Sequence, residues 1–349
     1  METSNVKEVE KNERGGIPPQ AVVMGSISGY FFSFVIKTAV DLGVFKALKE
    51  GVATKEALSA YLEVDAKSLH RLMRALVSME LVTLNASGQY AVTVLGQTLQ
   101  PGPTPQSIEP LAEYMLSDFI VEAMAKLKNS IRTGQPSFDN SAWYQAGKVD
   151  TEQQQIVNRA MEVYSKVSLP AILTSYSFET FHVIVDVAGG LGHILTGILR
   201  TNPQAKGVLY DLPTTIERAQ NYIESVGMTE RCELIPGDMF KSIPAGGDLY
   251  IISKALNDWD DAHVLRTLTN IREAMSGESK LIIIEMLVDD THPTQEESIR
   301  DLFFLAITPG GGVRTRSEFT QLIEQAGMNI SRIIPASDQF CIIECEPKN

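Results

Sequence analysis

From residue 183 onward, short apolar runs alternate with longer segments that mix apolar and charged residues. The runs are VIVDVAG, KGVLYDL, CELIPGD, DLYIISKAL, SKLIIIEML, NISRIIP and FCIIECE. Short apolar runs of this kind are typical of buried strands, and the segments between them are typical of amphipathic helices. The alternation predicts an α/β fold with a doubly wound, Rossmann-like sheet.

The first hundred residues follow a different pattern. Residues 20–50 are apolar at helical spacing, with a break expected at Gly43. Thr54 and Asp65 are suited to begin the next two helices, because their side-chain oxygens can cap free backbone N–H groups. Two β-rich runs then flank the turn at Asn85-Ala-Ser-Gly88. Helix, helix and hairpin together predict a winged helix.

A winged helix suggests either DNA binding or packing against another copy of the chain. The first hundred residues hold 10 Lys+Arg and 10 Asp+Glu, whereas the whole chain has a formal net charge of -13. A neutral module in an acidic chain is a poor partner for nucleic acid or an anionic membrane. Dimerisation is therefore favoured, and a DNA-binding regulator is the least favoured function.

The remaining bulk features point to the cytoplasm. The cysteines Cys232, Cys341 and Cys345 are too few and too scattered for a disulfide framework or a zinc site, which suggests a reducing compartment. We expect no segment to reach the roughly 18 apolar residues that span a bilayer. The polar stretch METSNVKEVEKNERGG is expected to be a disordered tail rather than a signal peptide.

A glycine-rich turn follows the first predicted strand of the sheet. Gly189, Gly190 and Gly192 allow the backbone to pass close to a ligand. The free N–H groups of the helix that follows favour an anionic or polar group. Asp211 ends the next strand, where an acid can bind the hydroxyl groups of a ribose. Taken alone, this pattern fits NAD, FAD or S-adenosylmethionine (SAM).

The segments at the following strand ends narrow the choice of cofactor. In order, the glycine-rich turn, D-L-P, G-D-M-F and N-D-W-D-D resemble the plant-type class I SAM-dependent O-methyltransferases, which include the caffeic acid and hydroxyindole enzymes and bacterial antibiotic-pathway relatives. DLGVFKAL, LHRLMRALVSMELV and YAVTVLGQTL resemble that family's dimerisation domain. SIRTGQPSF and NRAM resemble its connector, and DLFFLAITPGGGVRTRSEFTQLIEQAGM resembles its C-terminal segment. The resemblance covers nearly the whole chain.

The resemblance implies a division into domains. It comprises a tail over 1–19, a winged-helix dimerisation domain over 20–105, a helical connector over 106–175 that forms part of the acceptor pocket, and a Rossmann-like catalytic domain over 176–349. It also implies a homodimer formed through the N-terminal domain. A role in secondary metabolism is expected at the level of the family.

The resemblance also implies roles for single residues. The methionine part of SAM would lie against the glycine turn, the ribose at the second strand, and the adenine at the third. The cofactor residues would be Gly189, Gly190, Asp211, Leu212, Asp238, Met239, Phe240, Ser253, Lys254 and Trp259. Ser253 stands where the family often has Lys or Arg, with Lys254 beside it, and Ala188 replaces the first glycine of the family's G-G-G.

The largest departures from the family concern the base. The family's catalytic histidine in H-D-W is Asn257 here, and asparagine cannot take a proton near neutral pH. Of the two glutamates that flank that histidine, Glu285 is retained and the other is Val313. Asn257 and Glu285 are therefore the catalytic candidates, with Asn257 orienting the acceptor and Glu285 acting either as a base or as a group that orients a neighbour.

Several chemistries remain open without the histidine. Alignment of acceptor and methyl group can carry much of the rate, so an acidic phenol, an enol carbon or an amine could be methylated on O, C or N. The alternative is a non-methylating enzyme that keeps SAM as a fixed positive charge for a cyclisation, a rearrangement or a hydroxylation. His292 is a minor candidate base, and His193 and His263 are expected to be structural.

The sequence thus predicts a SAM-dependent methyltransferase that acts on a small aromatic or polyketide-like molecule and releases S-adenosylhomocysteine. Its acceptor would lie beside Met161, Phe304, Thr308 and Asn257. No His/Asp cluster has the spacing of metal ligands, so no metal is expected.

Overall fold

The computed structural model describes residues 18–102, 107–138, 152–337 and 339–348. The chain forms two compact units, residues 1–116 and 117–349. The expected tail falls almost wholly outside the described residues, as do residues 103–106, where the dimerisation domain is expected to meet the connector. The finer division into four segments stays a prediction.

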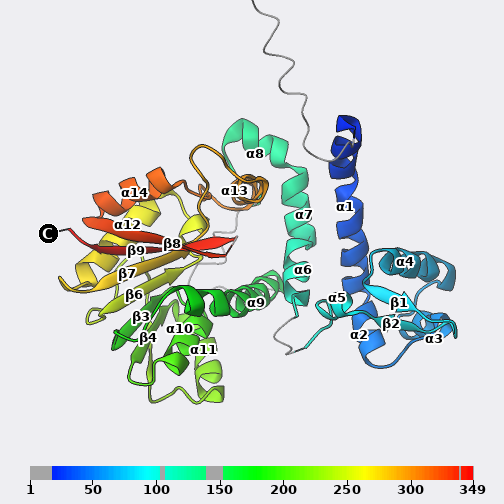
Figure 1. The fold of residues 1–349 in the computed structure, drawn as a ribbon, viewed down its shortest axis with the longest axis horizontal. Coiled ribbons are helices and arrows are strands. Elements are labelled where there is room, and N and C mark those ends of the chain that lie inside the picture. Colours follow the sequence, from blue (N-terminus) through cyan, green and yellow to red (C-terminus); the bar gives the residue numbers. More distant parts are fainter. Residues whose placement is uncertain (1–17, 103–106, 139–151, 338, 349) are drawn as a thin grey trace, which may run out of the picture. The chain divides into compact units, whose positions relative to one another are not determined.

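The first unit contains the predicted helices and hairpin (Figure 1). Gly43 separates the first two helices in a left-handed conformation, with φ 75°. Thr54 and Asp65 cap the third and fourth helices, accepting from the N–H groups of Ala57 and Ser68. The elements are α1 (Pro19–Asp41), α2 (Val44–Lys49), α3 (Lys55–Tyr61), α4 (Ala66–Ser78), β1 (Val82–Leu84), β2 (Tyr90–Val92), α5 (Val94–Gln97) and α6 (Glu109–Met115).

Helix α1 carries a large apolar surface that the single chain leaves exposed. Its exposed apolar side chains are Val23, Met24, Ile27, Tyr30, Phe31, Phe32 and Phe34. By length and composition alone, the 23-residue helix is apolar enough to cross a membrane, which by itself is weak evidence of a span. The expectation that no segment reaches this length is therefore wrong, because Gly, Ser and Thr interrupt the apolar residues without adding charge.

The second unit is built on a seven-stranded sheet in the order β5-β4-β3-β6-β7-β9-β8. The strands are β3 (Val183–Val187), β4 (Lys206–Asp211), β5 (Cys232–Pro236), β6 (Leu249–Ser253), β7 (Lys280–Glu285), β8 (Met328–Ser337) and β9 (Phe340–Pro347). Neighbouring strands from β5 to β7 pair in parallel, and β9 is antiparallel to both β7 and β8. Each predicted strand is present, so the doubly wound fold is confirmed.

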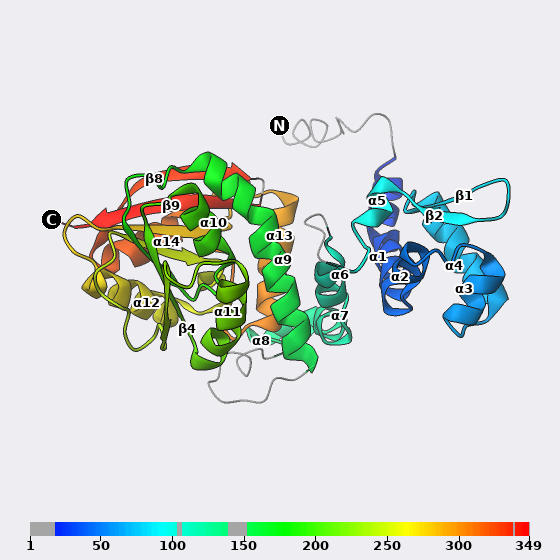
Figure 2. The ribbon, with the colours of Figure 1, turned by 90° about the horizontal axis from the view of Figure 1, so that it is seen from below.

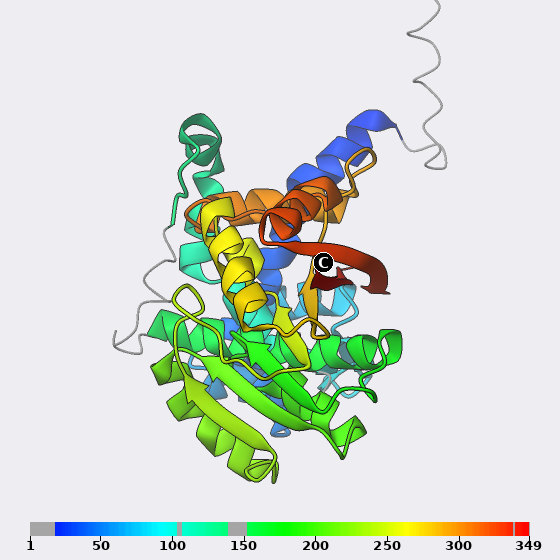
Figure 3. The same cartoon turned by 90° about the vertical axis from the view of Figure 1, so that its left-hand side faces the viewer.

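Helices cover both faces of this sheet. They are α9 (Glu152–Ser175), α10 (His193–Thr201), α11 (Pro213–Ser225), α12 (Asp261–Ala274) and α14 (Arg316–Gln325). The helices α7 (Asp118–Ala125), α8 (Leu127–Thr133) and α13 (Gln295–Ile307) instead pack against one another. Alternate residues of β3 point to opposite faces, so Ile184 joins the core beneath α9, α10 and α11, and Val185 joins the core beneath α12 and α14. Figure 3 shows α12 and α14 across the sheet from the green helices.

A buried carboxylate ties the C-terminal hairpin to the rest of the sheet. Glu344 on β9 accepts hydrogen bonds from Tyr176 Oη at 2.6 Å, Ser331 Oγ at 2.8 Å, and Lys280 Nζ and Arg332 Nη2 at 2.9 Å. Although burial alone would raise its pKa, these donors hold the pKa of Glu344 down to about 2. Strand β9, which lies between β7 and β8, is therefore held by ion pairs as well as by backbone hydrogen bonds.

Candidate active site

The order of the strands reverses at β3, which has β4 on one side and β6 on the other, so the sheet has a topological switch point there. In open α/β sheets, ligands bind beyond the carboxyl ends of the strands at such a point. A cavity of about 990 Å³ lies there, lined by the residues that follow β3, β4, β5 and β6 and by one side of α9. The fold thus provides one large site at the place that the sequence predicts.

The glycine-rich turn leaves no room for a side chain at Gly189. A Cβ atom on Gly189 would lie 2.5 Å from Cγ of Asp186 and 2.6 Å from Cδ1 of Leu209. Gly190 has φ 61°, and its N–H donates to Asp211 Oδ2 at 2.8 Å. Oδ1 of Asp211 accepts from the N–H of Leu212 at 2.7 Å. Asp211 therefore holds the turn against the end of β4.

Aromatic rings gather at another part of the cavity. Phe240 and Trp259 lie edge to face, with ring centroids 4.7 Å apart. Asp238 Oδ1 accepts from the N–H of Phe240 at 2.9 Å, and Asn270 donates to the carbonyl of Met239 at 2.8 Å. These contacts fix a flat, partly apolar wall of the kind that stacks against a ring.

The structure brings most of the predicted site residues together. The predicted residues that line the cavity are Met161, Gly189, Gly190, Asp211, Leu212, Asp238, Met239, Phe240, Ser253, Lys254 and Trp259. Asn257, Glu285, Phe304 and Thr308 do not line it. The roles assigned to all of these residues stay predictions.

The cavity wall holds polar atoms that lack partners. Six buried side-chain N or O atoms among the described residues have no hydrogen bond. Five of them belong to residues that line the cavity, namely Asn158 Nδ2, both oxygens of Asp186, His193 Nε2 and Ser253 Oγ. Because buried polar groups are normally paired, such a cluster indicates a polar ligand.

Asp186 is the most unusual of these residues, and the sequence reasoning missed it. Its side chain is 1 % exposed, at the centre of an apolar strand. Burial and, to a smaller extent, the charge of Asp211 raise its pKa to about 7, against the opposing charge of Lys254. An acid within VIVDV was the available signal, because a strand between two cores has no structural use for a carboxylate.

Asp186 should make the stability of the protein fall as the pH rises. Since its folded pKa lies above its unfolded value, the folded state binds the proton more tightly, and this stabilisation is lost as the pH rises toward 7. The free energy of unfolding should therefore fall less between about pH 5 and 8 in Asp186→Asn than in the unsubstituted protein. The two decreases should differ by about 1–3 kcal/mol. Urea unfolding at each pH measures this. The exposed Glu278→Gln should keep the original pH dependence, and an unchanged dependence in Asp186→Asn would contradict the prediction.

Lys254 crosses from the end of β6 to helix α9. Its Nζ donates to Ser168 Oγ at 2.8 Å. Its backbone is left-handed, with φ 53°, a strained conformation for a residue with a side chain. Burial lowers its pKa to about 8, against the negative charges of Glu285 and Asp186. The contact fixes one wall of the cavity relative to the sheet.

Asn257 lies on the short turn η2 (Leu256–Asp258) and is 3 % exposed. Its Nδ2 donates to the carbonyl of Met286 at 3.4 Å, whereas Oδ1 has no partner. Glu285 accepts from the N–H of Leu256 at 2.8 Å, and burial raises the pKa of Glu285 to about 7. Glu285 thus contacts the backbone beside Asn257.

The C-terminal glycine segment packs against the same turn. A Cβ atom on Gly311 would lie 2.4 Å from the carbonyl oxygen of Asn257 and 2.5 Å from Thr308 Oγ1. Thr308 Oγ1 in turn donates to the carbonyl of Phe304 at 2.8 Å. The structure therefore brings Asn257, Thr308 and Phe304 into one neighbourhood, and the residues Asp258 and Trp259 that follow Asn257 line the large cavity.

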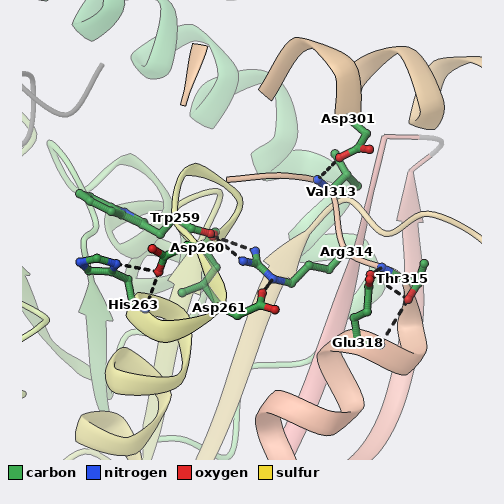
Figure 4. Close-up of polar contacts among 10 residues, drawn as sticks. Trp259, Asp260, Asp261, His263, Asp301, Val313, Arg314, Thr315 and Glu318 are labelled. Atoms are coloured by element: carbon green, nitrogen blue, oxygen red, sulfur yellow. Dashed lines mark hydrogen bonds and ion pairs between the residues drawn. The ribbon is translucent and has the colours of Figure 1, made fainter. Parts of the chain in front are cut away.

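Figure 4 shows how Val313 and Arg314 are held. The N–H of Val313 donates to Asp301 Oδ1 at 2.9 Å. Arg314 donates to Asp261 at 2.8 Å, to the carbonyl of Leu256 at 3.2 Å and to the carbonyl of Trp259 at 2.6 Å. Arg314 thus clamps both ends of the turn that carries Asn257, a role that the sequence reasoning missed.

The histidines differ in their surroundings. His292 lies in an exposed turn, where its N–H donates to Asp289. His263 contacts Asp260 at the start of α12. His193 is buried and lines the cavity, and its expected structural role stays a prediction.

Comparison with known proteins identifies the family. Residues 24–101 match the O-methyltransferase dimerisation domain, and residues 121–329 match the O-methyltransferase domain. The chain is 29 % identical to the phenazine O-methyltransferase PhzM of Lysobacter antibioticus, over 97 % of this chain and 99 % of that protein. It is 30 % identical to the 8-amino-8-demethylriboflavin N,N-dimethyltransferase of Streptomyces davaonensis, over 90 % of this chain and 91 % of that protein.

A solved structure agrees with these matches. The mitomycin 7-O-methyltransferase MmcR superimposes with a TM-score of 0.84 at 31 % identity, covering 94 % of this chain and 97 % of that chain. The family resemblance and the fold predicted from the sequence are both confirmed. The chain belongs to the O-methyltransferase family and is a SAM-dependent methyltransferase.

Proposed function

We propose that the cavity beside β3 binds SAM and that the protein transfers its methyl group to a small aromatic or polyketide-like acceptor. The observation that carries this proposal is the cluster of polar atoms without hydrogen bonds on the cavity wall, from Asn158, Asp186 and Ser253. The cofactor has an ammonium, a carboxylate and a ribose that would pair with such atoms.

The residues on the wall fit the parts of SAM. Gly189 and Gly190 would lie against the methionine part, Asp211 and Leu212 at the ribose, and the wall of Asp238, Met239, Phe240 and Trp259 at the adenine. Ser253 and Lys254 would complete the floor between β3 and β6. When bound, SAM supplies a methyl group on a positively charged sulfur, which is a good leaving group.

Asn257 would orient the acceptor. Because its Nδ2 faces the carbonyl of Met286, its unpartnered Oδ1 is left to accept a hydrogen bond. A carbonyl oxygen attracts an O–H or N–H group and repels an anion, so the acceptor would bind uncharged. Glu285 would position Asn257 through the N–H of Leu256, and Met161, Phe304 and Thr308 would line the acceptor pocket.

Rate would then come chiefly from holding the acceptor in line with the methyl group, which can supply several kcal/mol. Loss of a general base typically costs about 10²–10⁴-fold. An uncharged amine needs no base to attack, so N-methylation is the second candidate. The preference of Asn257 Oδ1 for a donor favours it, as does the similarity to an N,N-dimethyltransferase.

Mass spectrometry with SAM and matched panels of phenols, amines and enols tests the function. Product heavier by one CH₂, formed together with equal S-adenosylhomocysteine, is expected. Asn257→Ala should lower kcat about tenfold, as expected for one lost hydrogen bond, and leave the affinity for SAM unchanged. Loss of SAM binding in that variant would contradict the placement of Asn257. Conversion without mass gain while SAM stays intact would instead establish the non-methylating function.

We also propose that the protein is a homodimer joined through α1. The exposed apolar residues of this helix lie in a family of dimerisation domains, and a second copy would cover them. Ile27 and Phe31, one turn apart, are 59 % and 58 % exposed. Replacing both by Glu should halve the mass measured by light scattering, because charges in an apolar interface oppose association. Val94→Glu, at an 83 % exposed residue of the same unit, should leave the mass unchanged.

An unsubstituted protein of monomeric mass at micromolar concentration would contradict the dimer. No role for nucleic acid or membrane is proposed, and a cytoplasmic location stays an expectation from the sequence.

A further inference from the structure

Two ionisable side chains that the proposed function leaves unused lie beside each other on the cavity wall. His193 is the first residue of α10, and Glu162 lies on α9. Nε2 of His193 lies 3.5 Å from Oε1 of Glu162. The imidazole is buried and lies edge to face with Tyr222, with ring centroids 4.0 Å apart. Both side chains line the cavity.

The helices that carry this pair are held closely together (Figure 2). A Cβ atom on Gly197 of α10 would lie 2.4 Å from Cδ2 of Leu169 on α9, so the helices nearly touch there. Lys254 holds the neighbouring Ser168 from the end of β6. Glu162 is therefore presented to the cavity by a helix that is fixed on two sides.

Glu162 is a carboxylate at neutral pH. Its pKa is lowered to about 2, first by His193 and also by Lys166, against the effect of partial burial. Both of these partners contact Oε1, with Lys166 Nζ at 2.5 Å and His193 Nε2 at 3.5 Å. Oε2 is therefore available to a ligand.

The surroundings select the part of the ligand that Glu162 meets. Asp186, whose side-chain oxygens have no hydrogen bond, lines the same cavity, so two acidic side chains are placed to meet a cation. The N-terminus of α10 lies beside them, where free N–H groups favour a carboxylate. A cation beside an anion is the pattern of an amino acid. The aromatic wall is elsewhere, since Met239 and Trp259 pack against the core on the other face of the sheet.

We propose that Glu162 binds the α-ammonium of the methionine part of SAM, and that His193 is a positioning residue that holds Glu162 toward it. The inference rests on the proposed cofactor site and adds two residues that the family resemblance does not supply. It also explains why Nε2 of a buried histidine is directed toward α9 rather than into the core.

Calorimetric titration with three ligands tests the inference without an acceptor. SAM and S-adenosylhomocysteine both contain the amino acid, whereas 5′-methylthioadenosine lacks it. Glu162→Gln should weaken the first two by about 10- to 100-fold, the range for a hydrogen bond to a charged group. Binding of 5′-methylthioadenosine should change by less than about twofold, since that ligand cannot reach Glu162.

Each other outcome overturns the inference. Equal weakening of all three ligands would give Glu162 a purely structural role. Weakening of SAM alone would place Glu162 at the sulfonium, and no weakening would exclude contact. If the unsubstituted protein binds none of the three ligands, the proposed cofactor site itself is wrong. That outcome differs from the previous ones, in which the unsubstituted protein binds SAM and only the role of Glu162 is wrong.

Variants of the partners separate positioning from folding. His193→Ala should show the same ligand-selective loss at a smaller size, about 3- to 10-fold, because Glu162 remains but is no longer held. His193→Gln, whose amide can still donate to Glu162, should restore most of the affinity. Lys166→Met removes the other, more exposed partner of Glu162 and is the matched control, with affinity for SAM expected within about twofold. The positioning role would be overturned if His193→Ala also lost affinity for 5′-methylthioadenosine and if His193→Gln did not restore the affinity for SAM.

Discussion

Gly189→Ala should lower the affinity for SAM by at least about 100-fold, because one methyl group there closes the site. The new Cβ atom would lie 2.5 Å from Cγ and Oδ2 of Asp186 and 2.6 Å from Cδ1 of Leu209. Both neighbours belong to central strands and are buried, so the turn itself must shift. That shift breaks the bond from the N–H of Gly190 to Asp211 and moves the wall into the cavity.

Calorimetric titration with SAM measures this effect, with circular dichroism to show that the variant is folded. Gly277→Ala is the matched control, because nothing lies within 4 Å of a Cβ atom there. The control should bind SAM as the unsubstituted protein does. Affinity of Gly189→Ala within about threefold of the original would mean that the turn does not line the cofactor site.

Arg314→Leu should lower the free energy of unfolding by about 2–4 kcal/mol, the largest stability effect expected near the site. The substitution removes three hydrogen bonds, two of them to the carbonyls of Leu256 and Trp259, and the carbonyl of Leu256 keeps only the 3.2 Å bond from the N–H of Trp259 among the bonds described. Because both carbonyls flank Asn257, the turn should loosen, and kcat should fall more than the affinity for SAM. Arg314→Lys should not rescue the protein, since one ammonium cannot reach all three acceptors.

Two controls separate the contributions of Arg314. Arg316→Leu, two residues along at the exposed start of α14, should change stability by less than about 0.5 kcal/mol. Asp261→Ala should cost less than about 1 kcal/mol, because the side chain of Asp261 is 73 % exposed and such pairs are weak. Urea unfolding measures both. If Asp261→Ala costs as much as Arg314→Leu, the ion pair rather than the carbonyls holds the turn.

Local rules predicted the elements of this fold well. Thr54 and Asp65 cap helices as predicted, because a capping oxygen acts on N–H groups only three residues away. Gly43 breaks the first helical segment since its φ of 75° suits glycine. The strands followed from apolar runs that a sheet covered on both faces requires. The residues that line the cavity could be named because the carboxyl ends of parallel strands meet at one edge.

The side chains that tertiary packing directs could not be predicted in this way. Arg314 reads as one residue of a loop, and its three acceptors come from a segment more than fifty residues earlier. The sequence predicts His193 only as the first residue of a helix. Its contact with Glu162 depends on the packing of α9 against α10, which the sequence pattern does not give. The apolar surface of α1 was visible in the sequence, but whether a single chain covers it depends on the packing of the whole unit.

The position of β9 has a consequence for synthesis on the ribosome. This strand lies between β7 and β8, yet it follows every other strand of the sheet in the chain. Until it emerges, β7 presents an open edge, β8 has no neighbour in the sheet, and Lys280 and Tyr176 lack the carboxylate of Glu344. A nascent chain without β9 can therefore pair only the five strands from β5 to β7 in the sheet. Its β7 edge has unpaired backbone groups of the kind that promote aggregation and that chaperones protect. Completion of the sheet therefore waits for the insertion of eight residues, Phe340–Pro347, between two strands that are made before them.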